Sequence, residues 1–246
     1  MLQLWFGLYL RTKWYSMAQK KVLTLSNLSV GYSPESCLVN SATIEAYQGD
    51  LIAIMGLNGS GKTTLIKTLL NELPAISGEI ELGLSGAKTH EIFSVVFTER
   101  ISIYGFTVLD MISQGRAAYT NMFGKLSSKD KQVIQENLIA LNLEEIADQQ
   151  INSLSDGQFQ KVMIAKALAQ ETPILLLDEP TAFLDVKNKR MIHKLLSDLA
   201  QKQNKTILVS THDVSFCNDY CNKAWVIESG KLSEKKPKEI SESYFD

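Results

Sequence analysis

The sequence predicts an α/β protein in which helices wrap a parallel sheet, and three observations lead to that prediction. Apolar runs alternate with segments of helical periodicity from about residue 173 to residue 227, as expected for parallel strands joined by crossover helices. A glycine-rich loop at residues 56–64 lies between an apolar run and an amphipathic helix. Ahead of it, residues 21–30 and 38–47 alternate roughly as strands, with a turn between them.

Composition limits the classes of function. The chain has 246 residues, enough for one large α/β domain or two small ones. Its net charge of −2 argues against a dedicated nucleic-acid binder, which would carry a basic surplus. The three cysteines are too few for a disulfide framework, so we expect a reducing cytosol. Cys217 and Cys221 lie four apart on a predicted helix, and small buried side chains are favoured over a metal site because no other ligand pair accompanies them.

The first sixteen residues are expected to be an upstream extension, with the domain formed by residues 17–246. Residues 1–10 are apolar but too few to span a bilayer, for which about 20 are needed. Their positive charges follow the apolar run, unlike those of a signal peptide. Met17 then opens a stretch that resembles the start of a domain. A weak contact with a membrane surface is the alternative.

The stretch from Gly56 to Thr64 fits the phosphate-loop pattern G-x-x-x-x-G-K-[ST]. An apolar run, residues 51–55, precedes it as a buried strand would, and a helix predicted to end near Pro74 follows. Glycines allow backbone N–H groups to surround an anion, and the helix N-terminus adds partial positive charge. Lys62 would reach the β- and γ-phosphates of a nucleotide, and the Thr63 hydroxyl would bind Mg²⁺. The candidate phosphate-binding residues are Gly56, Asn58, Gly59, Ser60, Gly61, Lys62, Thr63 and Thr64.

The other elements follow in order. After the loop helix, the pattern predicts strands at Ser77–Leu82 and 93–97. A mostly helical insertion follows from about Thr107 to Asn152, with a helix start at Ser127–Asp130. The remaining predictions are a strand at 173–178, a helix at about 185–200, a strand at 206–210, a short helix near residue 213, a last strand at 224–227, and a polar tail from residue 231 to residue 246.

An acidic pair, Asp178 and Glu179, directly follows the apolar run at residues 174–177. Ligands of open α/β sheets bind at the C-terminal ends of the strands. Asp178 could therefore hold Mg²⁺, and Glu179 could orient and polarise a water that attacks the γ-phosphate.

The segment Leu154–Gln158 is close to the LSGGQ signature of ATP-binding cassette (ABC) ATPases, with Asp156 in place of the middle glycine. The similarity continues through residues 161–168, and the motifs occur in the family's order from about residue 23 to residue 231. The chain thus resembles an ABC ATPase. The resemblance implies a P-loop NTPase cassette with a RecA-like parallel-sheet core, an N-terminal antiparallel β subdomain and a helical signature subdomain at about residues 101–160.

The resemblance also implies roles for further residues. Tyr32 matches the aromatic residue that stacks on adenine, Asp185 belongs to the D-loop at the dimer interface, and His212 matches the switch histidine near the γ-phosphate. ATP and Mg²⁺ are the implied cofactors, with Lys62, Glu179 and His212 as catalytic residues. Two copies would pack head to tail, so that each ATP also meets the partner's signature residues Ser155, Asp156, Gly157 and Gln158.

One motif departs from the family pattern. ABC ATPases normally have a glutamine after the strand at 93–97, where it contacts Mg²⁺ and water and signals to the membrane partner. Here Thr98 takes that position and Glu99 follows. The metal contact and the coupling step are therefore open at this point.

The insertion resembles that of importers for iron–siderophore complexes, haem and cobalamin, which commonly have Gly-Arg-x-Pro where this chain has Gly115-Arg116-Ala117-Ala118. The resemblance implies an ATPase subunit on the cytoplasmic face of a bacterial membrane. Its partners would be a second copy, a separate polytopic permease and, indirectly, a periplasmic or lipid-anchored binding protein, with no nucleic acid. The alternative is a soluble cassette ATPase without transport, such as a scaffold in iron–sulfur cluster assembly.

Overall fold

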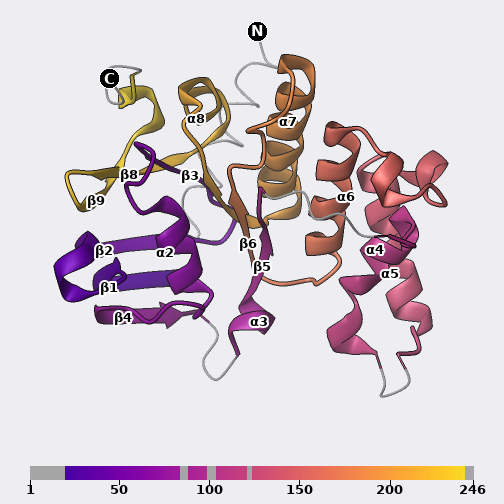
Figure 1. The fold of residues 1–246 in the computed structure, drawn as a ribbon, viewed down its shortest axis with the longest axis horizontal. Helices are drawn as coiled ribbons and strands as arrows, with labels where there is room; N and C mark the ends of the chain where they lie inside the picture. The colour runs from indigo at the N-terminus through magenta and orange to yellow at the C-terminus, as the bar shows by residue number, and fades with distance from the viewer. Residues whose placement is uncertain (1–19, 84–87, 99–103, 121–123, 242–246) are drawn as a thin grey trace, which may run out of the picture.

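Two sheets and a group of helices build the fold of the computed structural model, which describes residues 20–83, 88–98, 104–120 and 124–241 (Figure 1). The strands are β1 (Lys21–Gly31), β2 (Cys37–Tyr47), β3 (Leu51–Gly56), β4 (Ser77–Leu82), β5 (Phe93–Val96), β6 (Ile174–Asp178), β7 (Thr206–Ser210), β8 (Lys223–Glu228) and β9 (Lys231–Lys235). The helices are α2 (Lys62–Leu69), α3 (Thr89–Ile92), α4 (Val108–Gln114), α5 (Ser128–Ala140), α6 (Asp156–Leu168), α7 (Val186–Gln203) and α8 (Val214–Tyr220).

The larger sheet has the order β5-β6-β7-β3-β8-β9, and its pairs are parallel except for β8 with β9. All residues of β3, β6 and β7 are buried, as their uninterrupted apolar runs predict for strands covered on both faces. The phosphate loop follows β3, and the acidic pair begins at the end of β6. Because parallel strands end at the same edge, the two motifs come together there.

Alternation along the strands divides the core of this sheet between its two faces. Leu175 and Leu177 of β6 belong to a cluster with α6 and α7. Leu176 belongs instead to a cluster that includes α2 and the smaller sheet. Successive side chains of a strand point to opposite faces, so one short run contributes to both clusters.

The smaller sheet is antiparallel, in the order β2-β1-β4. Leu65, Ile66 and Leu69 of α2 are buried in a cluster with residues of β1 and β2. Helix α2 ends at Leu69, earlier than the expected end near Pro74, because Asn71 takes a left-handed conformation with φ 59°.

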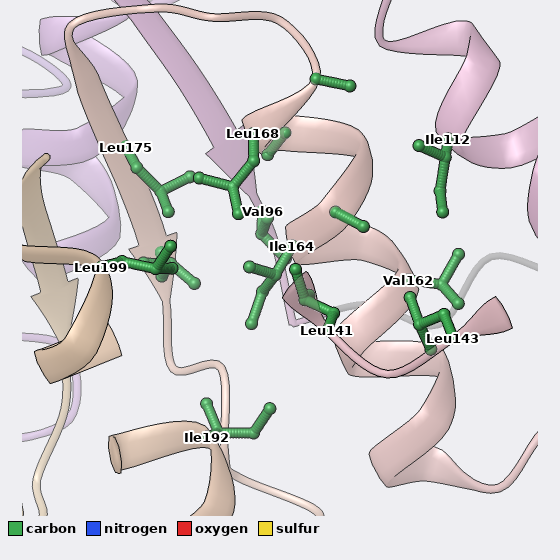
Figure 2. Close-up of a cluster of buried hydrophobic side chains, with 14 of the residues drawn as sticks. Val96, Ile112, Leu141, Leu143, Val162, Ile164, Leu168, Leu175, Ile192 and Leu199 are labelled. Atoms are coloured by element: carbon green, nitrogen blue, oxygen red, sulfur yellow. The ribbon is translucent and has the colours of Figure 1, made fainter. Parts of the chain in front are cut away.

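Helix α6 joins the helical part of the chain to the sheet. Val162 contributes to the same buried cluster as Ile112 of α4 and Leu143 after α5, while Leu168 lies beside Leu175 of β6 (Figure 2). The helix runs past the expected subdomain end at residue 160, to Leu168. One continuous core therefore connects the signature helix with the strand that carries the acidic pair.

The segment after the last predicted strand was wrongly expected to be a polar tail. Lys231–Lys235 forms β9, which pairs antiparallel with β8. Ser229 and Gly230 both have positive φ, 48° and 75°, as a two-residue hairpin turn requires. Leu232 is the apolar side chain that β9 buries.

Two other predictions concern the N-terminal extension and the cysteines. Residues 1–16 lie outside the described part of the chain, so the extension stays a prediction. Of the two cysteines predicted to be buried on one helix, Cys217 is buried on α8, whereas Cys221 is only partly buried and is the C-cap residue of that helix. Burial raises the pKa of the Cys217 thiol to about 12.

The described residues contain no group of three or more His, Cys, Asp or Glu side chains that could hold a metal ion. No described helix is long and apolar enough to cross a membrane.

Candidate functional site: a phosphate loop facing an acidic strand end

The loop between β3 and α2 has a geometry that only glycine allows at its end. Gly61, the N-cap residue of α2, has φ 109°, and a Cβ there would lie 2.9 Å from the Cβ of Leu38. The N–H of Leu65 donates to the Gly61 carbonyl (2.8 Å) as the helix begins. The loop amides thus precede a helix N-terminus, the arrangement that binds phosphate groups.

Lys62 lies under this loop and is only 5% exposed. Its Nζ donates to the carbonyls of Gly56 (2.9 Å) and Leu57 (3.2 Å) and lies 3.6 Å from Oε1 of Glu179. A buried ammonium group needs such partners. They hold the lysine at the junction of the loop and the acidic pair.

Asp178 is the point where three elements meet. Its Oδ2 accepts a hydrogen bond from the Thr63 hydroxyl of α2 (2.8 Å), and its Oδ1 accepts one from the Ser210 hydroxyl of β7. Its backbone carbonyl accepts a hydrogen bond from the Thr98 hydroxyl. The carboxylate is thereby fixed beside a hydroxyl, a pair of oxygen ligands that suits a hard cation such as Mg²⁺.

Glu179 is held by its backbone in a conformation that is uncommon for a non-glycine residue, with φ 45°. Its N–H donates to the hydroxyl oxygen (2.9 Å) and the carbonyl oxygen (3.1 Å) of Ser210. Such conformations occur where surrounding contacts enforce them, often at functional sites. Here they turn the side chain toward Lys62.

These side chains line one cavity of about 540 Å³, a size that suits a small-molecule ligand. The lining residues that the sequence predicted as site residues are Tyr32, Asn58, Gly59, Gly61, Lys62, Thr63, Thr64, Asp178 and Glu179, and Thr98 lines the cavity as well. Ser60 Oγ is buried without a hydrogen-bond partner among the described residues. An unpaired buried hydroxyl in a phosphate loop fits a phosphate oxygen as its missing partner.

Tyr32 lines this cavity and is placed to contact a flat ligand there. It is 71% exposed, and the N-cap Ser33 begins the short turn Pro34–Ser36 beside it. An exposed ring at the rim of a phosphate-binding cavity offers one face for stacking.

The position that is glutamine in most of the family is Thr98, and its short side chain is already engaged. The hydroxyl bonds the Asp178 carbonyl while the residue lines the cavity. Thr98 therefore ties the end of β5 to the end of β6. Glu99 lies outside the described residues.

The signature segment begins α6 with a capping box. Ser155 Oγ accepts the N–H of Gln158 (3.3 Å), and the Gln158 Oε1 accepts the N–H of Ser155 (3.0 Å). Ser155 and Asp156 are exposed. A Cβ on Gly157 would lie 2.6 Å from Oδ1 of Asn188, so a larger residue here would displace the Asn188 side chain.

The D-loop aspartate lies at that same contact. Asp185 is the N-cap of α7 and accepts the N–H of Asn188 (2.8 Å) and its side-chain amide (3.0 Å). Asn188 thus connects Asp185 with the signature helix at Gly157. The signature residues do not line the 540 Å³ cavity of their own chain.

His212 follows β7 and precedes the N-cap Asp213 of α8. It is exposed and does not line the cavity. Its backbone position is nevertheless close to the site along the chain, because the Thr211 N–H donates to the Ile54 carbonyl of β3 (3.0 Å) and Ser210 contacts Asp178 and Glu179.

Sequence reasoning missed Ser210, Leu38 and Ser36. Ser210 is a small polar residue at the end of a buried strand, and that placement is the signal that could have identified it. Leu38 and Ser36 line the cavity from the turn before β2 and its first residues, and no local pattern distinguishes them.

Comparisons with known proteins agree with this geometry. The family model "ABC transporter" matches residues 39–182. An ABC transporter ATP-binding protein of Methanocaldococcus jannaschii, itself uncharacterised, is 38% identical over 86% of this chain and 74% of its own length. The molybdate import ATP-binding protein MolC of Haemophilus influenzae is 39% identical, covering 78% of this chain and 73% of MolC. A probable siderophore transport ATP-binding protein of Bacillus subtilis is 32% identical, covering 89% and 82%.

Solved structures give the same result. A metal-chelate type ABC transporter in an inward-facing conformation superposes with a TM-score of 0.81 and 34% identity, covering 89% of this chain and 85% of that one. A dimeric ATP-binding cassette, bound to ADP and Pi in a post-hydrolysis state, superposes with a TM-score of 0.72 and 27% identity, covering 87% and 98%. The resemblance inferred from the motifs is therefore confirmed, and the chain belongs to the ATP-binding, ATP-hydrolysing subunits of the ABC transporter family.

Proposed function

We propose that this chain powers a bacterial importer for an iron complex (a siderophore or haem) or for cobalamin, working at the cytoplasmic face of the membrane with a separate permease. One observation supports the ATPase activity: Lys62, Thr63, Asp178 and Glu179 line the same cavity. The transport half is supported by relatives whose names state siderophore transport and by the likeness to a metal-chelate type transporter.

The residues fit ATP with Mg²⁺. The phosphate loop would hold the β- and γ-phosphates, Ser60 Oγ would gain a partner, and Tyr32 would stack on adenine. Thr63 and Asp178 would hold the metal ion, which when bound neutralises phosphate charge during transfer. Lys62 would stabilise the charge that develops on the γ-phosphate.

Glu179 is the proposed general base. Its carboxylate, next to the Lys62 ammonium, would accept the proton of the attacking water while the lysine limits its orientation. His212, exposed just beyond β7, would approach the γ-phosphate when the site closes. Positioning and charge neutralisation then account for most of the catalysis.

A second copy is proposed to complete each site. The exposed Ser155 and Asp156, with Gly157 and Gln158 behind them, would face the partner's nucleotide. Asp185 would lie at the same interface, because Asn188 links it to the signature helix. A related cassette that is dimeric in its structure supports this arrangement.

The decisive experiment is purification of the natively expressed chain from detergent-solubilised membranes. We expect a polytopic membrane protein to accompany it and to raise its ATP hydrolysis rate after reconstitution. A chain that stays wholly soluble, without such a partner, would overturn the importer and favour a non-transport ATPase.

The cargo requires its own measurement. Cells lacking the gene should lose uptake of a radiolabelled ferric siderophore, haem or cobalamin. Because one relative is named as a molybdate import protein, molybdate uptake should be measured in parallel. Loss of molybdate uptake alone would overturn the proposed cargo while leaving the importer intact.

A further inference from the structure

A second cavity, of about 40 Å³, lies between the start of α6 and the segment after β6. The polar residues that line it are Thr98, Asp156, Gln160 and Glu179, and the rest of its wall is apolar. Thr98 and Glu179 also line the nucleotide-sized cavity. The proposed base therefore lies between two cavities, one for the nucleotide and one facing the signature helix.

Gln160 is the residue in this wall without an evident structural reason. It is 8% exposed, and its Nε2 has no hydrogen-bond partner among the described residues. Gln158, two residues earlier, is occupied in the capping box with Ser155. A buried N–H donor without a partner lowers stability, so native proteins usually retain one for an ordered water or for function.

The donors and acceptors around the cavity are complementary to a single water. The Thr98 hydroxyl gives its hydrogen to the Asp178 carbonyl, so its oxygen can still accept. The carboxylate of Glu179 can only accept. Gln160 therefore supplies a donor that the other lining side chains do not. The volume exceeds the roughly 10–15 Å³ that a water needs, and two to four polar partners are available.

We propose that Gln160 is a positioning residue for ATP hydrolysis: its carboxamide holds a water that donates to Thr98 and Glu179 and so keeps the Glu179 carboxylate in one orientation. This rests on the proposed role of Glu179 as base. With Lys62 Nζ at 3.6 Å from Oε1, the carboxylate is held from both sides. Gln160 also lies on the helix that Ser155 begins, so engagement of Ser155 by a second copy would act on the base through α6.

The test compares Gln160→Leu with Gln201→Leu, a matched change on the exposed face of α7. Gln160→Leu should lower kcat at least about tenfold, because a misplaced catalytic group is costly. The KM for ATP and the Kd of a non-hydrolysable ATP analogue should stay within about twofold. Its Tm should stay within about 2–4 °C of the wild-type value, since replacing a polar side chain by an apolar one of similar size is close to neutral for stability. Gln201→Leu should leave all four quantities unchanged.

Two results with Gln160→Leu would overturn the inference. One is wild-type kcat in Gln160→Leu, and the other is a joint fall of kcat, Tm and analogue affinity, which a packing role would cause. A high-resolution crystal structure provides a readout independent of turnover. It should show a water within hydrogen-bonding distance of Gln160 and Glu179, and a dry cavity would also refute the proposal.

Failure of this inference is distinguishable from failure of the proposed function. Wild-type protein without ATPase activity, or Glu179→Gln with full activity, would remove the base itself. An inactive Glu179→Gln together with a fully active Gln160→Leu would leave the base in place and reject only the role of Gln160.

Discussion

At the scale of single residues, the site depends on two side chains that hold each other. Lys62 is buried under the phosphate loop and lies 3.6 Å from Glu179. Glu179 keeps an uncommon backbone conformation through its N–H contacts with Ser210. Their roles differ nonetheless, because Lys62 also bonds the loop carbonyls while Glu179 faces the cavity from the end of β6.

Glu179→Gln should abolish turnover while ATP binding persists. Glutamine keeps the shape of the side chain but cannot accept a proton, so kcat should fall at least about 100-fold. Steady-state ATPase assays and titration with a fluorescent ATP analogue measure the two effects. Glu136→Gln, on the exposed face of α5, is the control that should behave as wild type. Full turnover in Glu179→Gln would exclude it as the base.

Lys62→Ala should weaken nucleotide binding itself, by about tenfold or more, because charge-assisted hydrogen bonds to phosphate are lost. Isothermal titration with an ATP analogue measures the change. Lys67→Ala, on the same helix but outside the cavity lining, should bind within about twofold of wild type. Unchanged affinity in Lys62→Ala would contradict the phosphate contact.

At the scale of elements, one arginine ties the helical part of the chain together. Arg116 follows α4 and is 1% exposed. Its Nε donates to Asp130 of α5 (2.9 Å), and its Nη1 donates to the Ala169 carbonyl at the end of α6 and to Glu171 (2.7 Å each). The guanidinium also lies 3.8 Å from the centroid of the Tyr119 ring. Arg116, which belongs to the segment that resembles iron–siderophore importers, thus has a structural role.

Arg116→Met should lower Tm by about 10 °C, because removing one member of a buried ion pair leaves its partners uncompensated. Differential scanning calorimetry measures the shift. Lys202→Met, which breaks the exposed i,i+4 pair with Asp198, should change Tm by less than about 2 °C. Equal shifts in Tm in the two variants would show that the ion pairs of the buried Arg116 stabilise the fold no more than a surface pair does.

The ion pair between Arg116 and Asp130 also predicts that the stability of the fold depends on pH. The pKa of Asp130 is lowered to about 2, because the Ser127 hydroxyl and N–H donate to the carboxylate and Arg116 pairs with it. A carboxyl with a lower pKa in the folded state stabilises the fold above its ordinary pKa of about 4. That contribution is lost as the pH falls from about 4 to about 2.

Asp130→Asn is the variant that reports this effect. Urea unfolding should show wild type more stable than Asp130→Asn at pH 5, with the difference shrinking as the pH falls through that window. A difference that stays constant down to pH 2 would mean that the ionised carboxylate contributes nothing.

At the scale of the whole molecule, the phosphate loop of one chain and its own signature residues do not line the same cavity. Lys62 and Glu179 line the nucleotide-sized cavity, to which the exposed Ser155 and Asp156 do not contribute. A head-to-tail pair of copies would bring the two groups to each ATP and give two equivalent sites related by symmetry.

Mixing two inactive variants tests this arrangement. Lys62→Ala damages the phosphate-loop half of a site, and Ser155→Arg damages the signature half. Half of the dimers in an equal mixture should be mixed, each with one intact site, so about a quarter of wild-type activity should return. Lys62→Ala mixed with Glu179→Gln is the control without recovery, because both changes lie in the same half. No recovery in the first mixture would favour a site within one chain.

Much of the fold was predictable because its signals are local. The run at residues 174–177 predicted a buried strand followed by an acidic pair, and Ser127 with Asp130 predicted the start of α5. The strand β9 was missed, because Leu232 alone provides little alternation and its formation depends on pairing with β8.

The candidate residues for phosphate and metal were predictable for the same reason: loop, helix start and strand end are neighbours along the chain, and local sterics and hydrogen bonding determine their geometry. Three features could not be predicted from the sequence: the hydrogen bond between Ser210 and Asp178, the ion pairs of the buried Arg116, and the cavity beside Gln160. Each joins residues far apart in sequence, and the side chains meet only when strands and helices pack. The sequence therefore specified the nucleotide chemistry, while tertiary packing decided what holds the proposed base in place.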